Sequence, residues 1–221
     1  MIPRLTVGLR PAILAAAIAL TTALSNPLGA SAETTIEIAP MNQQDGAWAG
    51  ARLGTSPTET IGSAGCAITA VTMMLRYYGI KTDPGTVNAW LTANGGYAFD
   101  DQLIWYAVTR YSAGRVAFSG WLGPDPNVIA PELDAGRPVI AEVQLGGNQH
   151  FVLLTGYTLS GGLVMDDPWF GDVLSFNARY GDPAAGILSI RTFMVGDPAG
   201  LGVDGKVNWL ANAISAVQLA R

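Results

Sequence analysis

The pattern of apolar positions divides the chain into a helical part and a strand-rich part. Between residues 66 and 78, apolar residues recur at helical spacing, and the glycine that follows is a typical helix stop. Asp83-Pro84 combines an N-cap with a proline at the first helical position, which predicts a second helix over residues 84–94. The same spacing predicts a third helix over residues 100–111, with the two aspartates at its start as a cap pair.

After residue 116 the pattern changes to short runs rich in Val, Ile, Leu and Phe, joined by glycine-containing loops. Such runs predict an antiparallel sheet with one well-buried face, interrupted by a short helix over residues 127–135. The predicted strands cover residues 116–122, 138–145, 150–157, 162–167, 172–176 and 187–195. Helices first and strands second, without βαβ alternation, is an α+β order.

The two ends of the chain differ from this central part. Residues 1–32 have the features of an export signal: Arg4 and Arg10 precede a short apolar run, and Ala30-Ser31-Ala32 is an A-x-A cleavage site. Cleavage near Ala32 would release a soluble protein that is secreted or held in the periplasm or cell envelope. Because the apolar run falls short of the ~20 residues that span a bilayer, no stable membrane insertion is expected after signal removal.

The remaining chain is predicted to be one domain with a tail. Residues 33–200 form the domain, in which the polar, glycine-rich residues 33–62 make an ordered surface arm. Residues 201–221 form a tail whose apolar stripe predicts an amphipathic helix that docks on the domain or on a partner. The stripe consists of Val207, Leu210, Ala211, Ile214 and Val217.

Charge and composition exclude several classes of function. The chain has 12 Lys and Arg against 17 Asp and Glu, and loss of Arg4 and Arg10 changes the net charge from −5 to −7. This balance argues against nucleic acid or anionic lipid as a partner. With one Cys, one His and no acidic loop of EF-hand form, the sequence predicts neither an internal disulfide nor a metal site nor a cofactor.

The single cysteine and the single histidine are the candidates for chemistry. Cys66 is at a helix start after the small residues Ser63, Ala64 and Gly65, and His150 is at a strand start. A helix N-terminus and an adjacent imidazolium both favour a thiolate, which is the nucleophilic form of a thiol. A lone cysteine in so apolar a run is more often a buried small hydrophobe, and a lone histidine is usually structural. The joint placement of the two residues favours chemistry.

A carboxylate on the next strand would orient the imidazole. If residues 156 and 161 close a four-residue loop, His150 and Asp167 are direct cross-strand neighbours, and Asp166 points to the other face. A two-residue turn at residues 160–161 would instead place Asp167 opposite Leu154, about 13 Å along the strand from His150 at ~3.3 Å per residue. The chemistry predicts the longer loop, with Asp167 as the orienting group.

Other polar and aromatic side chains are candidates for the surroundings of such a site. The Cys66 amide and a glutamine amide, from Gln43 or Gln44, are suitable donors to an oxyanion. Trp48 and Trp169 either wall a cleft or form a satellite of the core.

The segments NQQDGAW, LGTSPTETIGSAGCAITAVTMMLRYYG, HFVLLTGY and MDDPWFG resemble the papain-like cysteine peptidases, in particular stand-alone exported proteins related to the bacteriocin-processing, double-glycine-leader peptidases. The resemblance covers about residues 42–195. It implies a papain-like α+β fold, in which a helical lobe that carries the cysteine packs on an antiparallel sheet that carries His and Asp. It also implies Cys66 as nucleophile, His150 as base, Asp167 as orienting acid and Gln44 as oxyanion donor.

The chain departs from the transporter-fused relatives in two ways. Their glutamine stands a few residues before the cysteine and a glycine follows the cysteine, whereas here the separation is 22 residues and Ala67 follows Cys66. With no transporter region, leader cleavage coupled to export is not implied.

The expected function is therefore an exported cysteine hydrolase that cleaves peptide bonds of a peptide or protein substrate through an acyl-thioenzyme. The same residues would serve a peptidoglycan amidase or a transamidating enzyme, since the thioester does not fix the acceptor. The third alternative is a binding module on a peptidase scaffold that has lost activity.

Overall fold

The computed structural model describes residues 33–196. Its helices are α1 (Ile61–Ala64), α2 (Cys66–Tyr77), α3 (Pro84–Ala93), α4 (Tyr106–Tyr111), α5 (Pro126–Asp134), α6 (Phe176–Tyr180) and α7 (Pro183–Gly186). Its strands are β1 (Thr34–Thr35), β2 (Tyr97–Ala98), β3 (Gln102–Leu103), β4 (Val116–Leu122), β5 (Val139–Leu145), β6 (Asn148–Tyr157), β7 (Leu163–Asp167), β8 (Asp172–Ser175) and β9 (Ser189–Val195).

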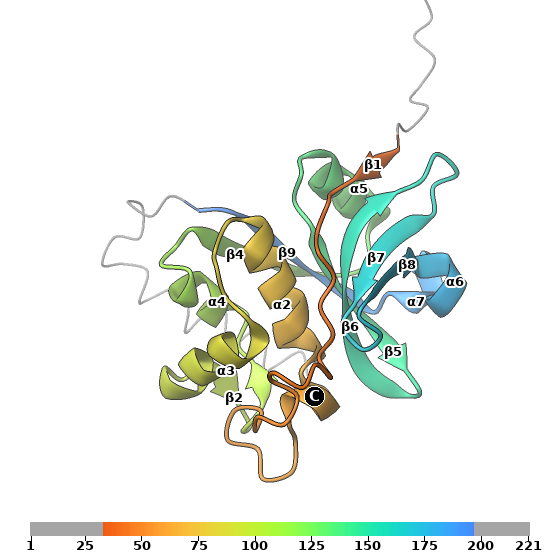
Figure 1. Cartoon of the computed structure of the whole chain (residues 1–221). Coiled ribbons are helices and arrows are strands. Elements are labelled where there is room, and N and C mark those ends of the chain that lie inside the picture. The colour runs from red at the N-terminus through yellow and green to blue at the C-terminus, as the bar shows by residue number, and fades with distance from the viewer. Residues whose placement is uncertain (1–32, 197–221) are drawn as a thin grey trace, which may run out of the picture. The chain divides into compact units, whose positions relative to one another are not determined.

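One antiparallel sheet dominates the described part of the chain (Figure 1). Its strand order is β4-β9-β5-β6-β7-β8, and β1 pairs with the last residues of β6. The β5–β6 turn is Gly146-Gly147, both with positive φ, which a two-residue turn between twisted strands requires. The predicted antiparallel sheet is confirmed, and each predicted strand is present within two residues of its predicted ends.

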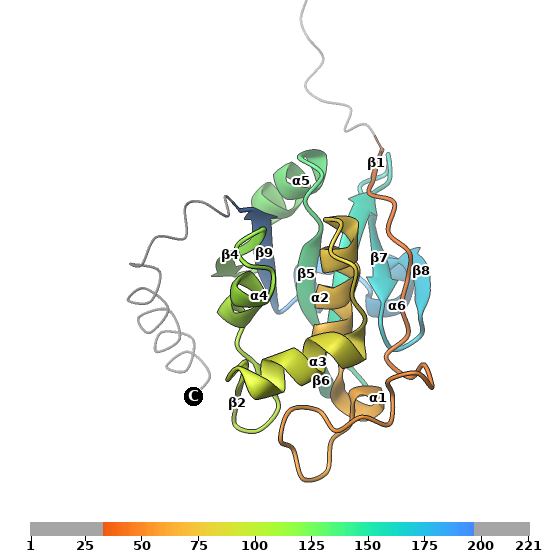
Figure 2. The same cartoon turned by 60° about the vertical axis from the view of Figure 1, so that its left-hand side comes forward.

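Helices cover both faces of this sheet (Figures 1 and 2). In β6, Phe151 and Leu153 belong to one hydrophobic cluster, whereas Val152 and Leu154 belong to another, so the two clusters lie on opposite faces. The first cluster includes residues of α2, α3 and α4, and the second includes residues of α5 and α6. The prediction of one buried face was therefore wrong, because helices that follow the first half of the sequence also pack on the second face.

The predicted helices at residues 66–78 and 84–94 are confirmed as α2 and α3. Asp83 accepts a hydrogen bond from the Thr86 amide and caps α3, as predicted. The predicted helix at residues 100–111 was wrong in its first half. β2 and β3 form a hairpin there, and Phe99 and Asp100 have positive φ in its turn. Asp100 and Asp101 are therefore turn residues rather than a helix cap, and α4 begins only at Tyr106.

The arm before α2 is ordered and is fixed at several points. Ile36 is buried and its amide donates to the carbonyl oxygen of Thr155 in β6. Further along, Leu53 joins the first cluster. The predicted signal segment and the predicted C-terminal helix lie outside the described residues. Within residues 33–196, no helix has both the length and the apolar character needed to cross a membrane.

Candidate active site

Cys66 is the first residue of α2 and is buried. The short helix α1 leads directly into α2, and a capping box between Thr60 and Ser63 stabilises the start of α1. A Cβ at Gly65 would lie 2.5 Å from the carbonyl oxygen of Ile61, so only glycine fits between the two helices without a backbone shift. The sulfur is thus held at a helix N-terminus, where the first amides have no acceptor inside the helix.

His150 stands between Cys66 and Asp167. Its Nε2 is 2.9 Å from Oδ1 of Asp167, and both side chains are buried. The interaction with Cys66 is close enough to raise the pKa of the His150 ring. Because Nε2 is engaged with the carboxylate, Nδ1 is the ring nitrogen left for the sulfur.

The strand register that brings His150 and Asp167 together differs from both predicted registers. Leu153 is opposite Asp166, and a bulge near Thr155 separates this register from the pairing of Tyr157 with Leu163. Continued along the strands, this register places Asp167 opposite Val152, two residues from His150 on the same face. The predicted direct pairing was wrong, but the diagonal distance between the two residues still allows the hydrogen bond.

The Asp167 carboxylate is fully buried and accepts four hydrogen bonds. Oδ1 accepts from His150 and from the Trp169 amide at 3.0 Å. Oδ2 accepts from Arg179 at 2.9 Å and from the Tyr180 hydroxyl at 2.7 Å, both at the end of α6. Arg179 also binds both carboxylate oxygens of Asp172 at 2.8 Å. The carboxylate is therefore fixed on both sides.

These contacts determine the charges in the site. Burial lowers the pKa of His150, but the hydrogen bond to Asp167 and the interaction with Cys66 outweigh burial and raise the pKa to about 9. Burial raises the pKa of Asp167, but His150, Tyr180 and Arg179 outweigh burial and hold it below its usual range. Near neutral pH the imidazole is therefore cationic and the carboxylate anionic.

The two glutamines differ in their placement. Gln43 is buried. Its main-chain amide donates to the carbonyl oxygen of Pro168 at 2.8 Å, and its side-chain Nε2 donates to the carbonyl oxygen of Gly62 in α1 at 3.1 Å. Gln44 is exposed, and its main-chain amide donates to Oδ1 of Asn42. Gln43 thus bridges the loop after Asp167 and the helix before Cys66, whereas the side chain of Gln44 extends from the arm into solvent.

The remaining candidates lie around this group. Asp166 is buried on the other face of the sheet, as predicted for the longer loop, and its Oδ1 has no hydrogen-bond partner among the described residues. Trp48 is half-buried against the first cluster and donates to the carbonyl oxygen of Asn42 at 2.9 Å. Trp169 is half-buried in the loop after Asp167.

Sequence reasoning missed Arg179 and Tyr180. They follow Asp167 by 12 and 13 residues, beyond a strand and a turn. The one available signal was the pair Arg-Tyr in an otherwise small and polar stretch after β8, which carries little information without the fold.

A helical layer that presents a cysteine at a helix start, packed on an antiparallel sheet that presents histidine and aspartate, is the papain-like arrangement. The model of the Peptidase_C39 like family matches residues 35–181, and the chain belongs to this family. The resemblance to papain-like cysteine peptidases and the α+β fold class are thereby confirmed, and the family indicates a cysteine peptidase-type function. No curated protein matches the chain.

Proposed function

We propose that this protein is an exported cysteine peptidase in which Cys66 is the nucleophile, His150 the proton carrier and Asp167 the orienting acid. The observation that carries the proposal is the buried imidazole of His150, which hydrogen-bonds to Asp167 and whose pKa is raised by both Asp167 and Cys66. A structural histidine needs no thiol partner at a helix start. Family membership supports the same class of chemistry.

The proposed chemistry uses Cys66 as the nucleophile and His150 as the proton carrier. The thiolate of Cys66 attacks the carbonyl carbon of the scissile amide, and the imidazolium of His150 donates its proton to the leaving nitrogen as the C–N bond breaks. Water then attacks the thioester, His150 takes one of its protons, and the acid product leaves as the sulfur is released. Asp167 keeps the ring plane and the Nε2 proton in place throughout.

The oxyanion of the tetrahedral intermediate needs at least one further donor besides the Cys66 amide. The sequence resemblance suggests Gln44 as this donor, but Gln44 is exposed, which favours the neighbouring Gln43 instead. Gln43 is buried next to α1, and its Nε2 carries a second hydrogen beyond the one donated to Gly62. We therefore assign the second oxyanion donor to Gln43.

Iodoacetamide labelling and casein hydrolysis test the proposal together. Cys66 in the protein from residue 33 onward should be alkylated rapidly at pH 6, and the His150→Ala variant should lose this rapid reaction. Hydrolysis of fluorescein-labelled casein should fall by about 10³-fold or more in Cys66→Ala, with an unchanged melting temperature. Slow labelling that is the same with and without His150 would show that the protein is not a cysteine enzyme.

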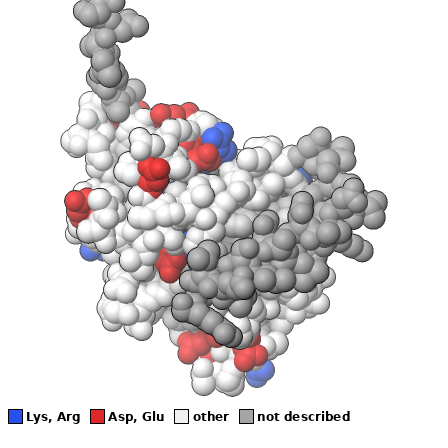
Figure 3. Space-filling model, turned by 180° about the vertical axis from the view of Figure 1, so that it is seen from behind, with Lys and Arg blue, Asp and Glu red and all other residues white. Residues whose placement is uncertain are grey.

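The substrate class is tested in the same assay. On the face that Figure 3 shows, the acidic residues lie in separate small groups, some of them next to a basic residue. Peptide libraries and cell-wall fragments are compared side by side. Release of new amines from cell-wall fragments alone would identify an amidase on the same residues. Rapid labelling without turnover of either substrate would place the substrate outside both classes, whereas slow labelling without turnover would identify a binding module.

Export is proposed from the sequence of residues 1–32 alone. Expression of the whole chain in a bacterial host should give a mature protein whose N-terminal residue is Glu33, outside the cytoplasm. An intact N-terminus in the cytoplasmic fraction would contradict this proposal.

A further inference from the structure

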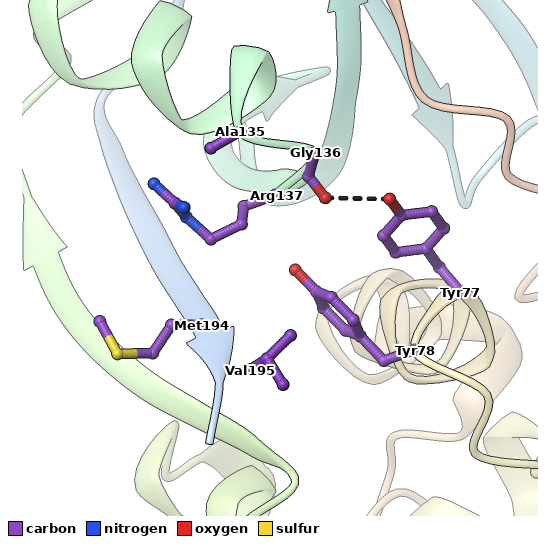
Figure 4. Close-up of a pocket in the computed structure, with 7 residues that line it drawn as sticks. All are labelled: Tyr77, Tyr78, Ala135, Gly136, Arg137, Met194 and Val195. Atoms are coloured by element: carbon purple, nitrogen blue, oxygen red, sulfur yellow. Dashed lines mark hydrogen bonds between the residues drawn. The ribbon is translucent and has the colours of Figure 1, made fainter. Parts of the chain in front are cut away.

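A hollow lies at the end of α2 that is opposite to Cys66 (Figure 4). Its volume is about 570 Å³. Tyr77 and Tyr78 at the end of α2 form one wall, residues 135–137 between α5 and β5 form another, and Met194 and Val195 of β9 form the third. A hydrogen bond from the Tyr77 hydroxyl to the carbonyl oxygen of Gly136 closes one corner.

The lining of this hollow combines exposed apolar side chains with an unsatisfied polar group. Val195 is 68% exposed, Met194 48% and Tyr77 39%, although all three are large apolar or aromatic residues. The Tyr78 hydroxyl points into the hollow, is buried and has no hydrogen-bond partner among the described residues. Clustered exposed apolar side chains and a buried hydroxyl without a partner together indicate a surface that a further group covers.

The position at which the described chain ends identifies the occupant. Gly196 follows Val195 directly and lines a second hollow of about 290 Å³, together with Tyr78 and Arg115. Residues 197–221 begin at this point, and the ten residues from 197 to 206 can extend over about 33 Å. The apolar stripe of residues 207–217 can therefore reach the hollow without any constraint from chain length.

We propose that residues 207–217 of the same chain fold back as an amphipathic helix and dock in this hollow. The apolar stripe, with Ile214 at its centre, covers Tyr77, Met194 and Val195.

Docking at this place would hold the two halves of the molecule together. Tyr77 and Tyr78 lie at the end of α2. Arg137 lies just before β5, and Met194 and Val195 lie in β9 of the sheet. Since the first cluster already packs α2 on β6, docking would add to this packing at the end of α2 that is distant from Cys66. The docking does not depend on the proposed function.

Disulfide trapping tests the docking without any need for activity. In the full chain with Cys66→Ala, Val195→Cys is combined either with Ile214→Cys or with Asn212→Cys, which lies on the opposite side of the predicted helix. We expect a rapid intramolecular disulfide with Ile214→Cys and a much slower one with Asn212→Cys. Equal rates for the two pairs would overturn the proposal, and disulfide-linked dimers would show that a second copy covers the hollow.

Hydrogen exchange gives a second measurement in the same Cys66→Ala chain. Ile214→Glu should speed exchange of the amides near Tyr78 and Val195 by about tenfold or more, while Asn212→Glu leaves it unchanged. Unchanged exchange in Ile214→Glu would mean that the tail does not dock. Neither measurement uses turnover. Failure of the docking proposal would therefore not contradict the proposed peptidase activity, and a lack of peptidase activity would not contradict the docking.

Discussion

The two adjacent glutamines of the arm offer a matched test of the oxyanion assignment. Gln43 is buried beside α1, while Gln44 is exposed. Gln43→Ala should lower kcat by about 10²–10³-fold with a small change in KM, because the lost hydrogen bond forms only in the transition state. Gln44→Ala, one residue away, should change kcat by less than about twofold. If Gln44→Ala gave the larger loss in steady-state kinetics, the assignment would pass to Gln44.

The single histidine allows the pH dependence to be assigned to one residue. Burial lowers the pKa of His150, but the hydrogen bond to Asp167 and the interaction with Cys66 outweigh burial and raise the pKa to about 9. Activity that needs the imidazolium should therefore fall as pH rises through about 9. The stability that the charged ring contributes is fully present below pH 6.5, the pKa of the ring in the unfolded chain. It is lost as pH rises from there through about 9.

Asp167→Asn should move the alkaline limit of kcat/KM to lower pH by about one unit or more, because it removes the largest of the interactions that raise the pKa of His150. The NMR titration of the His150 ring measures the same shift directly. Asp182→Asn is the control, because that aspartate caps α7 at the surface and asparagine caps equally well. An unchanged alkaline limit in Asp167→Asn would show that the carboxylate does not act on the imidazole.

At the scale of elements, α6 positions the acid of the site. Arg179 joins Asp167 to Asp172 and stacks 3.8 Å from the centre of the Phe170 ring. Arg179→Gln leaves a buried carboxylate with one donor fewer, so we expect a loss of about 1–3 kcal/mol in the free energy of unfolding. The pKa of Asp167 should rise toward its usual range, which moves the acid limit of kcat/KM to higher pH.

The pair Arg137–Glu132 is the matched control for this arginine, because it has similar geometry at the surface. Arg137→Gln should cost less than about 1 kcal/mol and leave the pH profile unchanged. Urea unfolding and pH profiles of both variants, with Arg179→Lys as a partial rescue, check the prediction. Equal effects of the two substitutions would mean that Arg179 contributes only surface charge.

Helices and strands could be predicted from the sequence where one local signal determines them. Where a second feature, such as a turn or a bulge, overrides that signal, the prediction was wrong. Helical spacing and a glycine stop predicted α2, the Asp83-Pro84 cap predicted α3, and runs of Val, Ile and Leu predicted the strands. The helix at residues 100–111 failed because Phe99 and Asp100 adopt positive φ in a hairpin turn, which helical spacing does not reveal. The predicted pairing of β6 with β7 was wrong because a bulge near Thr155 shifts the register.

At the scale of the whole molecule, the proposed site is assembled from three segments that only the fold brings together. In the proposal the arm supplies Gln43, the start of α2 supplies Cys66, and the sheet supplies His150 and Asp167. The cysteine and histidine could be found from their rarity and placement. Arg179 and Tyr180 could not, because nothing in their local sequence distinguishes a buried partner of Asp167 from surface residues of a short helix.

The stability of the whole molecule should depend on pH through Asp166, which lies beside the site but on the other face of the sheet. Burial raises its pKa to about 7, and the charges of Asp172 and Glu37 add to this effect, while a hydrogen bond with Thr155 opposes it. The unfolded chain ionises this group near 3.8. The protonated carboxyl therefore stabilises the fold below that value, and the stabilisation is lost as pH rises to about 7.

Asp166→Asn keeps a neutral side chain of the same shape at every pH. It should raise the free energy of unfolding above about pH 7 by at most a few kcal/mol and flatten its fall between about pH 5 and 6. In that window His150 is charged in both states and Asp167 is ionised in both, so the difference from the parent protein isolates Asp166.

Urea unfolding of Cys66→Ala chains, which avoids self-digestion, measures the effect of Asp166→Asn. Asp125→Asn, which replaces an exposed cap of α5, is the control and should change stability equally at each pH. If Asp166→Asn also changed stability by the same amount at pH 4 and pH 8, the buried carboxyl would be ionised throughout, and the interior beside the site would be more polar than the fold indicates.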